Sequence, residues 1–332
     1  MGELRRDPVK NRWVIIDPER PDREAALKVE AQPPPPLSGP CPLCPGNELM
    51  TPPEIVAFGE PLRQRNQPGW WVRVTPDLQP LCRIEGDFDR RPEGPFDVMN
   101  AVGAHEIVVE SPEHHLTWAE LPEQQLERVL RAYRLRSLDL RLDGRFRSLI
   151  VVKNHADAAS ILQHPHSHVL AFPFVPYGIE EELRGCREFY ARKERCAFCD
   201  IMLHERVSRV RRVEETDHFV VLAPFASRFP FETWVLPLRH ASDFASIGDG
   251  ELVDLAGLMK RMMRMLGKVL GNQSCTIVLH TAPFDEPHTD DYHWHLEILP
   301  KTATVEGFGW GARLFVNPVT PEEAAARLRQ AI

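Results

Sequence analysis

Hydrophobic residues along the chain form short runs that predict strands and two longer series that predict helices. The strand-like runs lie at 13–16, 71–74, 106–109, 149–152, 219–222, 233–236 and 276–279. Apolar residues at helical spacing are Leu126, Val129, Leu130, Tyr133 and Leu138 in one series and Leu252, Leu255, Met259, Met262 and Leu266 in the other. The polar stretch that ends in the proline run 33–36 has neither pattern, so we expect an exposed loop there.

These features occur in the same order in both halves of the chain. Each half has a Cys-x-x-Cys pair, strands, a proline shortly before a histidine, a helix, a strand and a His-x-His run. We therefore predict an internal duplication, with an N-terminal domain over 1–180 and a C-terminal domain over 181–332. The alternative is two unrelated halves that each carry metal ligands.

The two Cys-x-x-Cys pairs are candidate metal knuckles, because one such turn supplies two of the four ligands of a tetrahedral zinc ion. Histidines at matching places complete each set, although His115 is a rival for His114 in the first half. The sequence predicts two zinc ions per chain, one held by Cys41, Cys44, His114 and His164, the other by Cys196, Cys199, His240 and His293. A redox pair or small buried thiols are the alternatives, but no thioredoxin-like pattern surrounds either pair.

The run His164-Pro165-His166-Ser167-His168 is the candidate catalytic segment. Alternate residues of a strand share one face, so the three histidines would point the same way. With His164 bound to zinc, His166 stays free, and a neutral imidazole whose other nitrogen is hydrogen-bonded can act as a nucleophile. A larger metal cluster that uses all three histidines is the alternative.

Charge and composition exclude several classes of protein. The formal net charge is −8 and basic residues are not clustered, which argues against binding to nucleic acid. No apolar run reaches the roughly 18 residues of a membrane span, and the N-terminus lacks an apolar signal core. We therefore expect a cytoplasmic protein without a membrane or nucleic-acid partner.

Several of these motifs together resemble the galactose-1-phosphate uridylyltransferase family, the nucleotidylyltransferase branch of the histidine-triad superfamily. The histidine run resembles the superfamily's active-site strand. Further similar segments lie at 5–9, 12–20, 41–48, 111–114, 154, 280–284, 316–318 and 321–325. The resemblance implies an α+β fold of two duplicated histidine-triad-like half-barrel domains with mostly antiparallel sheets, assembled as a homodimer.

The resemblance also implies a ping-pong reaction between nucleotide sugars and sugar 1-phosphates. His166 would accept the nucleotidyl group, with His168 as its catalytic partner. The matching positions predict that Arg20 and Arg23 lie near the nucleotide, Asp77 and Leu78 near the base or ribose, and Asn154 and Ser160 near the phosphates. Some family members hold a second-half metal through a glutamate and three histidines, which would match Glu182, His280, His293 and His295, but the duplicated cysteines favour the set with Cys196 and Cys199.

Two departures from the family pattern bear on specificity. His168 stands where the family usually has glutamine, and an imidazole there can donate a hydrogen bond and also exchange protons. The segment Gly307-Phe308-Gly309 lacks a carboxylate that resembles a sugar ligand. Both departures predict weaker selection for galactose 1-phosphate as acceptor.

Three functions fit these motifs. The predicted function is the first, an enzyme that acts as UDP-glucose–hexose-1-phosphate uridylyltransferase, and the other two are alternatives. The second is a nucleotide-sugar phosphorylase or hydrolase (for ADP-glucose, for example) or a dinucleotide phosphorylase or hydrolase, with the same nucleotidyl-histidine. The third is a non-catalytic nucleotide-binding zinc protein.

Overall fold

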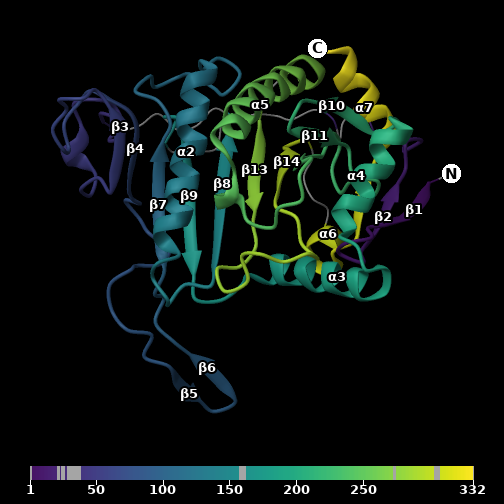
Figure 1. Cartoon of the computed structure of the whole chain (residues 1–332), viewed down its shortest axis with the longest axis horizontal. Helices are drawn as coiled ribbons and strands as arrows, with labels where there is room; N and C mark the ends of the chain where they lie inside the picture. The colour runs from purple at the N-terminus through teal and green to yellow at the C-terminus, as the bar shows by residue number, and fades with distance from the viewer. Residues whose placement is uncertain are drawn as a thin grey trace.

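A ten-stranded antiparallel sheet runs through the protein in the order β10-β11-β12-β14-β13-β8-β9-β7-β4-β3 (Figure 1). Its strands are β3 (Val56–Gly59), β4 (Trp70–Pro76), β7 (Ala104–Val109), β8 (Ser148–His155), β9 (His166–Phe172), β10 (Arg212–Glu215), β11 (Phe219–Leu222), β12 (Thr233–Pro237), β13 (Cys275–His280) and β14 (His295–Pro300). The computed structural model describes residues 2–20, 23, 27, 39–156, 162–271, 274–302 and 307–331. The proline run 33–36 and Ser160 lie outside the described residues.

Smaller elements flank this sheet. A three-stranded sheet joins β1 (Glu3–Arg6), β2 (Trp13–Ile16) and β15 (Phe315–Asn317), and β5 (Arg91–Glu93) pairs with β6 (Phe96–Val98). The helices are η1 (Glu48–Met50), α2 (Glu123–Leu140), α3 (Tyr177–Lys193), α4 (Ala197–Ser208), η2 (Phe244–Ser246), α5 (Asp249–Leu270), α6 (Gly307–Ala312) and α7 (Pro321–Gln330).

The strand order is repeated in the two halves of the large sheet. Counted from its two edges, β3-β4-β7-β9-β8 corresponds to β10-β11-β12-β14-β13. The halves meet where β8 pairs with β13, with Val152 opposite Val278. The predicted α+β class, with duplicated halves and mostly antiparallel sheets, is confirmed. The predicted boundary after residue 180 stays a prediction, because the sheet continues across the junction.

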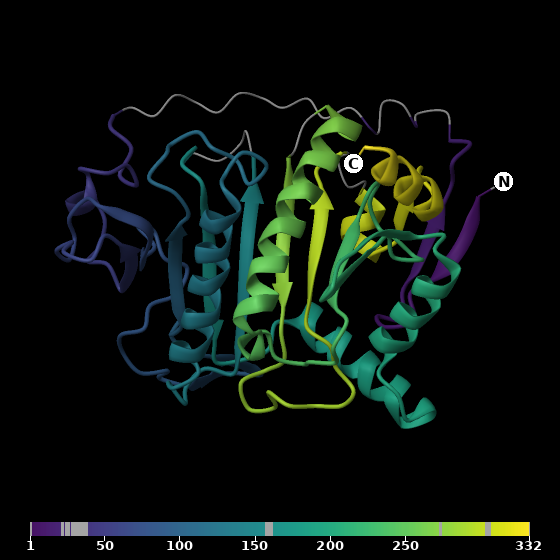
Figure 2. The ribbon, with the colours of Figure 1, turned by 45° about the horizontal axis from the view of Figure 1, so that its top comes forward.

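Helices α2 and α5 lie side by side on one face of the sheet (Figures 1 and 2). Successive side chains of a strand point to opposite faces of the sheet, so each strand contributes residues to both faces. On β11, Phe219 and Val221 belong to the core beneath α5, whereas Val220 and Leu222 belong to a second core with α3 and α4. The second half of the sheet is therefore covered on both faces, while His166 and His168 of the first half stay only partly buried.

Every strand predicted from an apolar run and both predicted helices are present. One detail of the first helical series is wrong, because Leu138 is 45% exposed and lies outside the buried stripe of α2. The sequence pattern misses α3, whose narrow apolar stripe of Ile179, Leu183 and Cys186 is hidden among charged residues. Within the described part of the chain, no helix has both the length and the apolar character needed to span a bilayer.

Candidate functional site

The first cysteine and histidine cluster forms as the sequence predicts. The Sγ atom of Cys44 lies 3.1 Å from Nδ1 of His114 and 3.6 Å from Nδ1 of His164. One ligand atom from each of these residues and from Cys41 lies within 4.8 Å of the others. His115 stacks edge-on against His114, with ring centroids 4.5 Å apart, and is not a member of the cluster among the described residues.

The turn that carries these two cysteines is fixed by its own residues. Gly46 has φ of +92°, a left-handed value that disfavours other residues. The amide of Asn47 donates to the carbonyl oxygen of Cys41 at 2.8 Å. The buried Glu48 accepts from the indole N–H of Trp70 at 2.8 Å. The segment 41–48 is therefore a rigid knuckle tied to β4.

The second cluster repeats this arrangement with a different backbone. Cys196 precedes the first residue of α4 and Cys199 lies in its first turn. The Sγ atom of Cys199 lies 3.4 Å from Nδ1 of His240 and 3.5 Å from Nδ1 of His293. The ring centroids of His240 and His293 are 5.2 Å apart at 89°, and those of His114 and His164 are 5.2 Å apart at 86°.

Both clusters fit a tetrahedral zinc ion. Each offers two thiols and two imidazole Nδ1 atoms, a common donor set for structural zinc. The Nε2 atoms of His164, His240 and His293 lie 2.7, 3.0 and 2.9 Å from backbone carbonyl oxygens. An N–H must point at each carbonyl, so the Nδ1 lone pairs face the cluster, as metal binding requires.

His166 is held as a neutral imidazole whose second nitrogen has no hydrogen-bond partner among the described residues. Its Nδ1 lies 2.7 Å from the carbonyl oxygen of His164, so Nδ1 carries the proton and donates it. The lone pair is therefore on Nε2. Burial lowers the pKa of His166 to about 4, which keeps the ring unprotonated near neutral pH.

A buried ion pair supports the strand from the opposite face. Nζ of Lys153 lies 2.6 Å from Oε2 of Glu110 and donates to the carbonyl oxygen of His166 at 3.3 Å. Ser167, between the two histidines, donates to the other oxygen of Glu110. These contacts fix the backbone at His166 and at the residue that follows it.

His168 belongs to a separate polar cluster with Asp77 and His105. Its Nδ1 lies 3.0 Å from Nε2 of His105 and 3.4 Å from Oδ2 of Asp77. The ring centroid of His168 is 5.1 Å from that of His166, so the cluster borders the free imidazole. The structure thus brings two predicted site residues, Asp77 and His168, into contact.

The other predicted substrate contacts are placed differently. Leu78 is 37% exposed beside Asp77. Val152 of β8 pairs with His168. Asn154 follows two residues later, so it lies on the same face of the sheet, where it is exposed.

Arg23 is ion-paired with Glu323 of α7. Because α7 packs against β10, the described chain places Arg23 in the other half of the sheet from His166 (Figure 1). Arg20 lies three residues before Arg23.

The second half contains a covered copy of the free histidine. Nδ1 of His295 lies 3.0 Å from the carbonyl oxygen of His293, as Nδ1 of His166 does from that of His164. His295 is fully buried, and the Phe198 ring of α4 lies 4.6 Å from its own. A nucleotide therefore has no access to this copy.

His295 and three groups around it, Glu182, His280 and Glu297, form a set that resembles a metal site. His293, in contrast, belongs to the cluster with Cys199. Nζ of Lys10 lies 2.9 Å from Glu182 and 3.0 Å from Glu297. Burial opposes the charge of Lys10, but attraction by the two carboxylates raises its pKa overall. Arg228 also lies 2.6 Å from Glu297. Two basic groups thus already balance the two carboxylates, so this set does not fit an additional metal ion.

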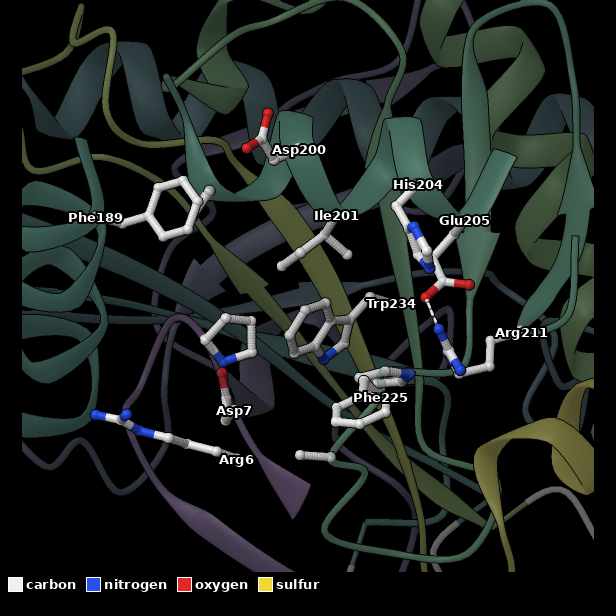
Figure 3. A pocket seen from close by; sticks show the side chains of 14 residues that line it. Arg6, Asp7, Phe189, Asp200, Ile201, His204, Glu205, Arg211, Phe225 and Trp234 are labelled. Carbon is white, nitrogen blue, oxygen red and sulfur yellow. Dashed lines mark hydrogen bonds and ion pairs between the residues drawn. The ribbon is translucent and has the colours of Figure 1, made fainter. Parts of the chain in front are cut away.

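A separate cavity of about 440 Å³ lies between β1, α3, α4 and β12 (Figure 3). Aromatic side chains of Phe189, Phe225 and Trp234 form much of its wall, and Arg211 at its edge is paired with Glu205. None of its lining residues belongs to the clusters around His166. The cavity is therefore separate from the site that contains His166.

Sequence reasoning missed His105, Glu110, Lys153 and Lys10. His105 and Glu110 were visible only as polar residues in or beside a buried strand. A polar side chain on a strand with buried neighbours is a signal for a hydrogen-bond network. Lys10 gave no local signal, since its partners lie in distant parts of the chain.

Removing the Lys10 charge should allow the set of Glu182, His280, His295 and Glu297 to bind a divalent metal ion. We expect Lys10→Met to lower the free energy of unfolding by about 3–5 kcal/mol, because Glu182 and Glu297 lose a buried counterion. Added Mn²⁺ should recover part of this loss and bind as one additional ion per chain. Thermal unfolding and elemental analysis would measure both effects, with Lys193→Met, at an exposed position on α3, as the control. An unchanged melting temperature and metal content would contradict this interpretation.

The chain is similar to known proteins along its whole length. Residues 2–176 match the family model for the galactose-1-phosphate uridyl transferase N-terminal domain, and residues 182–332 match that for the C-terminal domain. ADP-glucose phosphorylase of Arabidopsis thaliana is 33% identical over 99% of this chain and 92% of its own length. Galactose-1-phosphate uridylyltransferase of Thermotoga maritima is 28% identical over 99% of this chain and 98% of its own length.

Solved structures agree with these relatives. The crystal structure of an ADP-glucose phosphorylase from Arabidopsis thaliana with bound ADP-glucose has a TM-score of 0.82 and 31% identity, and covers 99% of each chain. A uridylyltransferase structure has a TM-score of 0.77 and 28% identity, over 100% of this chain and 98% of the other. Since both domains are matched in order, this chain belongs to the galactose-1-phosphate uridylyltransferase family.

Proposed function

We propose that this protein transfers a nucleotidyl group from a nucleotide sugar through a covalent intermediate on His166. The observation that carries the proposal is the hydrogen bond from His166 Nδ1 to the carbonyl oxygen of His164, at 2.7 Å, which leaves the Nε2 lone pair available. Burial keeps this imidazole neutral, and a neutral imidazole is the reactive form of a histidine nucleophile.

The reaction has two displacement steps. Nε2 of His166 attacks the α-phosphorus of the donor, the bond to the bridging oxygen breaks, and a sugar 1-phosphate leaves. An oxygen of a phosphate acceptor then attacks the nucleotidyl phosphorus, and the bond to Nε2 breaks. With orthophosphate as acceptor, ADP-glucose would give ADP and glucose 1-phosphate, and His166 returns to its starting state.

The two cysteine and histidine clusters would hold structural zinc. Closed four-ligand sites contribute folding energy rather than a reactive position. In the first site, Nδ1 of His164 would bind the metal, and its carbonyl oxygen would orient His166. All seven cysteines are free thiols, which suits a reducing compartment, so we propose the cytoplasm as the location.

We propose ADP-glucose as the donor and orthophosphate as the acceptor. The similarity to ADP-glucose phosphorylase supports this choice over the whole chain. The absence of a carboxylate in the segment Gly307-Phe308-Gly309 argues against tight selection of a hexose 1-phosphate. UDP-glucose–hexose-1-phosphate uridylyltransferase, the function predicted from the sequence, becomes the second candidate, and it is supported by the family and by the Thermotoga maritima relative. The His166 geometry argues against a protein that only binds nucleotides.

Substrate contacts are part of the proposal. Asp77, Leu78 and Asn154 border the His166 site, and Ser160 follows in the sequence. Arg20 and Arg23 would reach a nucleotide at His166 only from a second chain, because Arg23 is paired with Glu323 of α7, which packs against the edge strand β10 of the other half. This placement supports the proposed homodimer.

The nucleophile is tested by trapping the intermediate. With donor labelled in the α-phosphate, wild-type protein should acquire an acid-labile nucleotidyl group, and His166→Ala should acquire none because it lacks the attacking nitrogen. His168→Gln should still form the adduct, since an amide also donates a hydrogen bond, and His115→Ala should behave as wild type. Labelling of His166→Ala at the wild-type level would rule out this nucleophile.

The donor and acceptor are tested with matched substrate pairs. We expect the value of kcat/KM for ADP-glucose with orthophosphate to exceed that for UDP-glucose with galactose 1-phosphate. Chromatography of the released nucleoside diphosphate and sugar 1-phosphate measures both reactions. The reverse preference would assign the second candidate, and turnover of neither pair would argue against both.

Metal content is tested by elemental analysis. We expect two zinc ions per chain, and one in either Cys44→Ser or Cys199→Ser, each with a lower melting temperature because a closed site contributes to folding. Cys82→Ser should keep both ions, because Cys82 is buried outside either cluster. Full zinc content in both ligand variants would contradict the assignment.

A further inference from the structure

His105 lies beside His168 on the same face of the sheet. Strands β7 and β9 are antiparallel, with Ile107 opposite His168 and His105 opposite Leu170. Residues two apart on a strand share a face, so His105 and His168 are diagonal neighbours. His105 is only 8% exposed, so its hydrogen-bond partners belong to the protein.

The hydrogen bonds around His105 determine where its proton lies. The backbone N–H of Leu81 donates to Nδ1 of His105 at 3.1 Å. A nitrogen that accepts a hydrogen bond cannot also carry the proton, so neutral His105 is protonated on Nε2. Burial lowers the pKa of His105 despite the nearby carboxylate of Asp77, which favours this neutral form.

The proton on His105 in turn determines the state of His168. Nε2 of His105 and Nδ1 of His168 are 3.0 Å apart, a distance with room for one proton. Because His105 supplies that proton, Nδ1 of His168 accepts it and neutral His168 carries its own proton on Nε2. The N–H of His168 is then on the ring edge away from His105.

A competing arrangement has both histidines donating to Asp77. Its Oδ2 lies 3.2 Å from Nε2 of His105 and 3.4 Å from Nδ1 of His168, both longer than the contact between the two imidazoles. Two N–H groups would then lie side by side across 3.0 Å, which is unfavourable. The other oxygen of Asp77 already accepts from the backbone N–H of Gln79 at 2.7 Å.

We propose that His105 is a positioning residue that fixes His168 as the Nε2–H tautomer, so that His168 presents a hydrogen-bond donor beside the nucleophile. This inference rests on the proposed nucleotidyl transfer through His166. An Nε2–H group can stabilise the phosphoryl oxygens, as a glutamine amide would. It cannot accept a proton from water at that nitrogen.

The tautomer also selects the class of acceptor. Water must lose a proton as it attacks the nucleotidyl phosphorus, and His168 in this state is not a base for it. The orthophosphate dianion and a sugar 1-phosphate carry oxygens that attack without such help. The arrangement therefore favours transfer to a phosphate anion over hydrolysis.

The tautomer can be read directly by nitrogen NMR of substrate-free protein labelled with ¹⁵N-histidine. The signals of His168 are those lost in His168→Gln. Near pH 7.5 we expect a protonated, pyrrole-type Nε2 and an unprotonated, pyridine-type Nδ1. Asp77→Asn should leave this pattern unchanged, because His105 rather than Asp77 fixes it. A protonated Nδ1 with an unprotonated Nε2 in the wild-type protein would overturn the proposal.

A pair of substitutions at His105 tests the catalytic consequence. In His105→Gln, the amide oxygen can accept from Leu81 and the amide N–H can donate to His168, so nucleotidylation should stay near the wild-type rate. His105→Phe fills the space without either bond and should slow nucleotidylation about tenfold, the effect of one lost hydrogen bond. The ratio of hydrolysis to phosphate-dependent turnover should rise only in His105→Phe. Equal rates and ratios in the two variants would overturn the proposal.

These measurements separate the inference from the function on which it rests. The NMR experiment needs no substrate, so it decides the tautomer even if no donor is turned over. Failure of every nucleotide sugar to label the wild-type protein would overturn the proposed function alone. Normal labelling with the wrong tautomer would overturn the role of His105 alone.

Discussion

The hydrogen bond between His166 Nδ1 and the carbonyl oxygen of His164 connects the proposed chemistry to the fold. His164 is 1% exposed and donates through Nε2 to the carbonyl oxygen of Ser111, so its backbone has little freedom to move. Lys153 donates to the carbonyl oxygen of His166, two residues further along, from the opposite face. If the His164 carbonyl shifted, the tautomer of His166 would no longer be defined, and neither would the position of its lone pair.

The duplicated halves show how one architecture yields one open site and one covered site. His166 and His295 each lie two residues after a histidine of a cysteine and histidine cluster. In both, Nδ1 donates to the backbone carbonyl oxygen of that histidine. In the second half, α3 and α4 cover that face, and Lys10 and Arg228 supply the positive charges beside Glu182 and Glu297. The histidine of the second half is thus buried in the core, while His166 and His168 of the first half remain partly exposed to solvent.

Much of the fold and of both cysteine and histidine clusters could be predicted from the sequence. The Cys-x-x-Cys pairs and the repeated order of features are local signals, and the structure brings together each predicted set of four residues. The pattern alone did not choose between His114 and His115, because adjacent residues differ only in orientation, which the fold determines.

The remaining parts depend on contacts between distant segments. Lys10 meets Glu182 and Glu297 only after folding, and His105 meets His168 only through the register of β7 and β9. The sequence indicated only that His168 can donate a hydrogen bond and exchange protons. Its environment depends on Leu81, His105 and Asp77, which lie far from it along the chain.

The most direct test of the account is to locate the covalent nucleotidyl group. Protein quenched after incubation with ADP-glucose in the absence of orthophosphate would be digested under mildly alkaline conditions, and the peptide that contains His164, His166 and His168 would be sequenced by mass spectrometry. The account predicts one added adenylyl group, on His166, which is lost when orthophosphate is supplied. An adenylyl group on another residue, or sustained turnover without any adduct, would contradict it.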